Sequence, residues 1–210
     1  MKGYKVINLK DIYNIYGEIK TKEILKDFKC EINKDVEYFI HDKAIEFSKQ
    51  DLAKTFLVIT SYKQKEVIVG YFAITNKGIN IKSILLSNTK KKKILRYALY
   101  DHETKKYIMA LPLIGQLGKN YNHGYNKLIT GDCLLKIACD KVREAQDILG
   151  GRFVFLECED KEKLRSFYEN NGFVCFGKRN LERDERKLNN GEYLLQMLCY
   201  LKDDNKSNDK

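Results

Sequence analysis

The sequence between residues 131 and 173, GDCLLKIACDKVREAQDILGGRFVFLECEDKEKLRSFYENNGF, most constrains the fold. Leu134, Ala138 and Val142 recur at helical spacing, which predicts an amphipathic helix that ends at a pair of glycines. Residues 152–158 then form a short run of aromatic and β-branched side chains, typical of a strand that is buried on both faces. The stretch therefore begins as a helix followed by a buried strand.

The second half of this stretch predicts another helix and another strand. Asp160 stands where an N-cap residue is expected, and Phe167 and Tyr168 fall on one side of the helix that would follow. Asn171-Gly172 offers a left-handed exit from that helix, after which a strand begins at Phe173. A helix, strand, helix and strand in succession indicate a mixed α/β protein.

Length and composition bound the organisation of the chain. With 210 residues and no linker, it is expected to form one domain over residues 1–201, followed by a disordered polar tail at residues 202–210. The net charge of +10 favours association with polyanions, although a solvated surface would carry the same charge. No apolar run is long enough to span a membrane, so we expect a cytoplasmic protein without a membrane partner.

Cysteine and histidine usage indicates neither a disulfide framework nor a metal site. The six cysteines are dispersed among apolar residues without a CxxC pair, which is typical of reduced, buried thiols. The three histidines lie far apart without metal-ligand spacing. We therefore expect no metal.

The remaining sequence predicts mostly antiparallel strands and two helical stretches. The predicted helical stretches cover residues 11–29, broken by Gly17, and residues 34–53. The predicted strands cover residues 4–9, the hairpin partners 55–61 and 67–75, residues 113–117 and residues 193–201. The lysine run at residues 90–93 is interpreted as a solvated loop, with a phosphate-contacting patch as the alternative.

A glycine at the start of a predicted helix suggests where an anion would bind. Gly131 follows Thr130 and precedes Asp132, so free backbone N–H groups and the positive end of the helix dipole meet there. An ordinary N-terminal turn would look the same. The sequence contains neither a P-loop nor a G-x-G-x-x-G motif, so a nucleoside-triphosphate P-loop is excluded and Rossmann-type dinucleotide binding is disfavoured.

This order of elements, with the unbroken motif FYENNGF at residues 167–173, resembles the GNAT acyltransferases. The resemblance implies a GNAT fold with a mixed, mostly antiparallel central sheet, flanking helices and a splayed central strand pair. The family's pyrophosphate loop, Q/R-x-x-G-x-G/A, aligns Asn126 with its first position, Ile129 with its middle glycine and Gly131 with its last. Two of these three positions depart from the family pattern.

The resemblance also implies roles for particular residues. Tyr168 would donate a proton to the departing thiolate, although a core aromatic is the simpler reading without the family match. The general base is read as Glu157 or Glu159, and either could equally be a solvated carboxylate. The implied cofactor-binding residues are Gln116, Leu117, Gly118, Asn126, Lys127, Ile129, Thr130, Gly131 and Asp132.

The implied activity is transfer of acetyl from acetyl-CoA to a primary amine by direct attack. The segments FLVIT, VIVGYFAIT and LPLIGQLGKN are similar to the GNAT toxins that acetylate aminoacyl-tRNA, which implies an RNA substrate and an antitoxin protein as partners. Deprotonating an α-amine near neutrality costs about 1 kcal/mol, against about 4 for a lysine amine, so a site without a clear base favours an α-amine. The alternatives are an acetyltransferase of protein lysine or small amines and a catalytically idle module that binds CoA or RNA. A homodimer is compatible with the sequence but not indicated by it.

Overall fold

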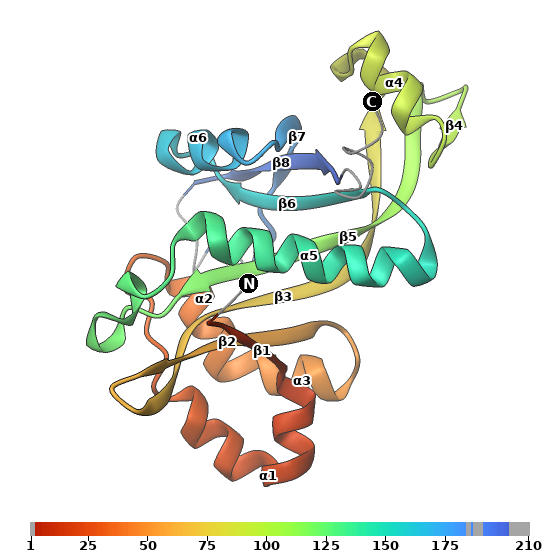
Figure 1. Cartoon of the computed structure of the whole chain (residues 1–210). Coiled ribbons are helices and arrows are strands. Elements are labelled where there is room, and N and C mark those ends of the chain that lie inside the picture. Colours follow the sequence, from red (N-terminus) through yellow and green to blue (C-terminus); the bar gives the residue numbers. More distant parts are fainter. Residues whose placement is uncertain (1–2, 184–185, 187–190, 202–210) are drawn as a thin grey trace, which may run out of the picture. The chain divides into compact units, whose positions relative to one another are not determined.

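The computed structural model describes residues 3–183, 186 and 191–201, which form two compact units (Figure 1). The first unit comprises the described parts of residues 1–75, 114–138 and 183–190, and the second those of residues 76–113, 139–182 and 191–210. Hydrogen bonds connect the described strands in the order β1-β2-β3-β5-β6-β8-β7, with β4 beside β5. The fold is therefore mixed α/β, as predicted. The expected tail at residues 202–210 lies outside the described residues.

The first unit is an antiparallel set of strands with helices packed on it. Its strands and helices are β1 Lys5–Asn8, α1 Leu9–Leu25, α2 Lys34–Tyr38, the π-helix η1 Phe39–Lys43, α3 Ala44–Lys49, β2 Lys54–Tyr62, the first part of β3 Lys65–Lys82, the last part of β5 Lys106–Lys119, the 3-10 helix η3 Asn122–Lys127 and the first part of α5 Gly131–Leu149. The core includes Phe28, Ile40, Leu57 and Tyr71, each fully buried. The Tyr71 hydroxyl donates to the Val36 carbonyl at 2.6 Å, which ties β3 to α2.

Sequence and local geometry agree closely in this unit. β2 pairs antiparallel with both β1 and β3, and the predicted hairpin turn falls between Tyr62 and Lys65. Gly17 adopts φ 73° inside α1, so the helix is interrupted there as the glycine predicted. Asn8 caps α1 by accepting a hydrogen bond from the Lys10 N–H at 3.0 Å.

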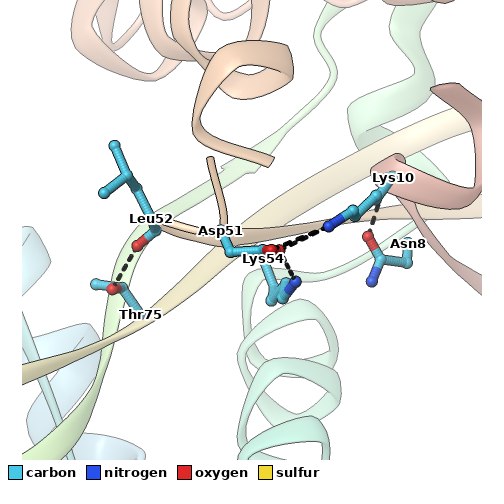
Figure 2. A network of polar contacts seen from close by, with 6 residues as sticks. All are labelled: Asn8, Lys10, Asp51, Leu52, Lys54 and Thr75. Carbon is cyan, nitrogen blue, oxygen red and sulfur yellow. Dashed lines mark hydrogen bonds and ion pairs between the residues drawn. The ribbon is translucent and has the colours of Figure 1, made fainter. Parts of the chain in front are cut away.

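A polar network fastens the turn before β2 to the start of α1 (Figure 2). The Lys10 Nζ lies 2.8 and 3.1 Å from the two carboxylate oxygens of Asp51, and Lys54 also pairs with Asp51. Hydrogen bonds from Lys10 and then Lys54 lower the pKa of Asp51 to about 2. The Thr75 hydroxyl adds a bond of 2.7 Å to the Leu52 carbonyl.

The second unit combines the antiparallel strands β6, β8 and β7 with residues 76–113. Its elements are the last part of β3, the 3-10 helix η2 Ser83–Leu85, α4 Asn88–Ile94, β4 Leu99–Asp101, the first part of β5, the last part of α5, β6 Phe153–Glu159, α6 Glu162–Asn170, β7 Val174–Asn180 and β8 Tyr193–Tyr200. β8 pairs antiparallel with both β6 and β7. Apolar side chains from β3, α4, β5 and the β6–β8–β7 set form one core.

Several local expectations need correction. The lysine run predicted as a loop lies in helix α4, where the buried Ile94 anchors an otherwise polar sequence. The strand predicted at residues 113–117 extends over all of β5 and includes Pro112. Lys161, not Asp160, precedes α6 as its N-cap, because the Asp160 carboxylate accepts a hydrogen bond from the Tyr193 hydroxyl at 2.7 Å. Gly172 does end the helix with φ 83°, as predicted.

Among the described helices, none combines the length and the apolar character that a membrane crossing requires.

Candidate active site

The residues predicted to form the site fall into two sets, one in each unit. The cofactor-binding candidates from Gln116 to Asp132 lie in the first unit, whereas Glu157, Glu159 and Tyr168 lie in the second.

The end of β5 is packed so tightly that only glycine fits at position 118. A Cβ at Gly118 would lie 2.3 Å from Cγ1 of Val36, far inside any normal carbon contact. Beside it, the Gln116 amide donates to Asp35 at 2.8 Å, so α2 is held against this strand by both packing and a hydrogen bond. The backbone of Gln116, Leu117 and Gly118 is thereby fixed in place.

Asn120 joins three segments at the point where β5 ends. Its side chain is fully buried, and its amide donates to the carbonyls of Asp27 at 3.0 Å and Ile68 at 2.9 Å. Its side-chain oxygen accepts from the N–H groups of Lys29 and Asn122, both at 3.0 Å. A buried amide with four hydrogen bonds is fully satisfied, so it orients the loop that follows.

The loop that follows is held by one lysine and one tyrosine hydroxyl, which bond to its backbone carbonyls. Lys119 Nζ lies 3.0 Å from the Asn126 carbonyl and 3.3 Å from that of Ile129, and the Tyr4 hydroxyl donates to Leu128 at 2.7 Å. Lys119 is thus engaged in shaping the loop. Lys127 is exposed and remains the predicted side-chain cation for a phosphate.

The loop ends at the N-terminus of α5. Ile129 is only 3% exposed, so its side chain fills the interior and does not cover the outer face of the loop. Thr130 caps the helix, because its hydroxyl accepts from the Cys133 N–H at 3.1 Å and its carbonyl accepts from Leu134 at 3.1 Å. The helix dipole and the backbone at Gly131 suit a diphosphate, as the sequence predicted.

Tyr168 lies near the end of α6 in an aromatic setting. Its side chain is 8% exposed and makes edge-to-face contacts with Phe167 and Phe173 at centroid distances of 4.9 and 5.9 Å. Burial, followed by the neighbouring Cys158 thiol, raises the pKa of Tyr168 well above its ordinary value. Within the described residues its hydroxyl has no hydrogen-bond partner, so a protonated phenol is available to a ligand.

The two candidate bases are both paired with cations. Glu157 is 8% exposed, and its carboxylate accepts from Arg179 at 2.8 and 2.9 Å and from the Gln196 amide at 2.9 Å. Glu159 is 12% exposed and lies 2.6 Å from Lys161 Nζ. Both oxygens of Glu157 are therefore occupied within the folded second unit.

Sequence reasoning missed the residues that support the predicted ones. Asp35 bonds to Gln116 and Arg179 bonds to Glu157, across 81 and 22 positions of sequence. Asn120, at the start of the loop, bonds to the Asp27 carbonyl, 93 positions away. Polar residues of these types are common on surfaces, and no local motif marks these three.

The chain shares its fold with solved structures of AtaT and KacT, which confirms the predicted fold class. No family model matches the sequence, and no curated protein sequence matches it. The likeness is therefore one of structure.

Three solved structures illustrate the likeness. A Tyr-to-Phe mutant of KacT is 14% identical with a TM-score of 0.58, and the match covers 92% of this chain and 94% of that one. AtaT complexed with acetyl-methionyl-tRNAfMet is 15% identical with a TM-score of 0.56, covering 91% and 93%. AtaTR bound with AcCoA is 14% identical with a TM-score of 0.53, covering 93% of each chain. At these identities the comparisons establish a shared fold.

Proposed function

We propose that this protein is an acetyl-CoA-dependent N-acetyltransferase. The observation that carries the proposal is Tyr168, a nearly buried tyrosine inside the motif FYENNGF whose hydroxyl has no hydrogen-bond partner in the described part of the chain, on a fold shared with AcCoA-bound AtaTR. The two similar toxins AtaT and KacT have both been crystallised as Tyr-to-Phe mutants.

In the proposed reaction the amine attacks the thioester carbonyl, a C–N bond forms and the C–S bond breaks. Tyr168 supplies the proton that the departing thiolate takes up. A phenol kept protonated by its raised pKa remains a donor throughout the neutral range. The thiolate, of pKa about 8.5, is a weaker base than the phenolate, so this transfer is uphill and has to be coupled to loss of the proton from the attacking amine. That proton passes through the base and water to the phenolate oxygen, which restores the Tyr168 phenol.

The loop from Asn126 to Asp132 is assigned to the pyrophosphate. Its backbone is shaped by Lys119 and Asn120, and the buried Ile129 leaves its outer face unobstructed. Lys127 would add an exposed positive charge. The backbone of Gln116, Leu117 and Gly118 is assigned to polarising the thioester carbonyl.

The general base remains a prediction for Glu157 or Glu159. Glu157 would have to act while bonded to Arg179 and Gln196, which favours a relay through water over direct contact with the amine. An acceptor of low pKa reduces the demand on such a base. An α-amine therefore suits the site better than a lysine.

Aminoacyl-tRNA is the acceptor that we infer. AtaT has been solved complexed with acetyl-methionyl-tRNAfMet and with the C-terminus of the antitoxin AtaR, so an antitoxin partner is part of the same proposal. The net charge of +10 suits an RNA substrate. A single catalytic domain over residues 1–201 and a cytoplasmic location belong to this proposal.

Replacing Tyr168 tests the proposal most directly. Tyr168→Phe should lower kcat for acetylation by about 10²-fold or more while the Kd for CoA, measured by calorimetric titration, stays within about twofold. Tyr62→Phe, a tyrosine on β2, is the matched control and should retain full activity.

Three results would contradict parts of the proposal. Unchanged turnover in Tyr168→Phe would remove Tyr168 from the mechanism. Absence of CoA binding by the unmodified protein would reject the enzyme. Acetylation of peptides or polyamines in place of aminoacyl-tRNA would reassign the acceptor to protein lysine or small amines.

A further inference from the structure

Positive charge is concentrated in one segment of the second unit, residues 76–113. This basic segment holds nine of the 39 lysines and arginines but only two of the 29 acidic residues. It therefore contributes +7 of the net charge of +10 from 38 residues. The other 172 residues are close to electrically balanced.

Among the described residues, four cations of the basic segment lack the ion-pair partners that neutralise lysines elsewhere, whereas Lys77 lies 3.8 Å from the Glu157 carboxylate. In the first unit, Lys5, Lys20 and Lys22 each pair with a nearby glutamate. Among the described residues, Lys92 and Arg96 of the basic segment form no ion pair, although both are exposed.

Lys82 and Lys105 are likewise exposed and without an ion-pair partner in the described part of the chain. The two lie on neighbouring connections, because the Ser83 N–H beside Lys82 donates to the Lys105 carbonyl at 3.0 Å. The local positive potential is therefore left for a ligand to neutralise.

The basic segment is a folded element that presents its charges from a packed base. Ile94 of α4 is 1% exposed and packs in one core with Ile81, Tyr107 and Phe153. Lys93 lies 5.0 Å from the ring centroid of Tyr200, which fixes one side of the helix. Figure 1 shows α4 close to β4, which pairs with the first residues of β5.

We propose that this basic segment binds the phosphodiester backbone of the RNA that carries the acceptor amine, an inference that rests on the proposed function. Each lysine or arginine that neutralises a phosphate releases bound counterions, which gives affinity without base specificity. Tyr97, whose side chain is 38% exposed, and Arg96 add groups on which bases stack.

An acidic protein segment is the competing occupant, because Ile84 and Leu99 are 87% and 77% exposed in the same segment. RNA is favoured because a net charge of +7 within 38 residues, with four cations that have no ion-pair partner among the described residues, matches a chain of regularly spaced phosphates. The substrate inferred for the site is itself such a chain.

The test compares two variants that remove equal charge. Lys82→Gln, Lys92→Gln and Arg96→Gln are combined in one protein, and Lys5→Gln, Lys20→Gln and Lys22→Gln in the matched control. Fluorescence anisotropy with labelled deacylated tRNA at several salt concentrations measures affinity. We expect at least a tenfold loss for the first variant, with a salt dependence reduced by roughly two to three in log–log slope, and less than a twofold change for the control.

A catalytic readout separates this inference from the proposed function. With aminoacyl-tRNA, KM should rise in the first variant, whereas kcat/KM for a short aminoacyl-nucleoside should stay within twofold of the unmodified protein. Equal losses of tRNA affinity in both variants would overturn the inference. So would unchanged tRNA affinity combined with loss of binding to a poly-glutamate peptide, which would assign the segment to an acidic protein. If the unmodified protein acetylates no acceptor, the proposed function fails, while the tRNA measurement still decides this inference.

Discussion

A single buried amide, that of Asn120, determines much of the geometry around the candidate pyrophosphate loop. Its four hydrogen bonds reach the carbonyls of Asp27 and Ile68 and the N–H groups of Lys29 and Asn122. Removing the amide takes one hydrogen bond from each of these four backbone groups, although the Asp27 carbonyl keeps a second bond from the Asn122 amide at 3.1 Å.

Asn120→Ala should therefore lower the free energy of unfolding by about 2–3 kcal/mol, which urea denaturation measures. Asn122→Ala, which removes a half-buried amide bonded to Asp27, is the control and should cost about 1 kcal/mol or less. Equal losses of unfolding free energy in the two variants would show that the buried Asn120 contributes no more to stability than the half-buried Asn122.

Sequence predicts single residues well where the signal is local. Gly172 was predicted to end a helix and does so with a positive φ, because the left-handed conformation is a property of that position alone. Asp160 was assigned to the helix cap, but the carboxylate is taken by Tyr193, 33 residues later. The Arg179 and Gln196 contacts of Glu157 depend on strand register, which no local pattern reveals.

At the level of elements, the N-terminus of α5 combines a structural cap with the candidate anion site. Thr130 satisfies the Cys133 N–H through its hydroxyl, which leaves the first turn ordered around Gly131.

Thr130→Ala should destabilise the protein by about 1 kcal/mol, while Thr130→Ser, which keeps the hydroxyl, should restore most of that loss. Thermal or urea unfolding of the two variants measures the difference. A serine variant as unstable as the alanine variant would mean that the methyl group, not the hydroxyl, matters.

Elements were predicted where hydrophobic periodicity was strong and missed where it was absent. The β2–β3 hairpin, α5 and β6 all carry clear apolar patterns. Helix α4 has the sequence NTKKKKI, with the buried Ile94 as its anchor, so tertiary packing and not periodicity holds it. The strand at residues 113–117 was predicted to begin only after Pro112, yet a strand accommodates proline wherever its nitrogen is not needed as a donor.

Across the whole molecule, buried thiols make stability sensitive to alkaline pH. Burial raises the pKa of Cys30 to about 11 and, together with the nearby Cys175, that of Cys158 to about 12. In the unfolded chain these thiols ionise near pKa 8.5. Above that pH the unfolded state binds fewer protons than the folded state, so the free energy of unfolding falls as pH rises.

The free energy of unfolding should therefore decline between about pH 8.5 and pH 10, before tyrosines ionise. Replacing Cys30 and Cys158 together by alanine should flatten this decline, whatever the change in stability at pH 7. Urea unfolding at a series of pH values measures both slopes. Identical slopes in the two proteins would show that these thiols do not cause the decline in unfolding free energy at alkaline pH.

The hydrogen bond from Asn120 to Asp27 spans 93 residues of sequence, and this separation has a consequence for synthesis. At about 5–20 residues per second, a ribosome needs roughly 5 to 20 s to add the residues between the two partners. During that interval the nascent N-terminal segment carries the Asp27 carbonyl and the Lys29 N–H without the partners that Asn120 and Asn122 later supply. The packing of the first unit can therefore be completed only after the segment around Asn120 has been synthesised.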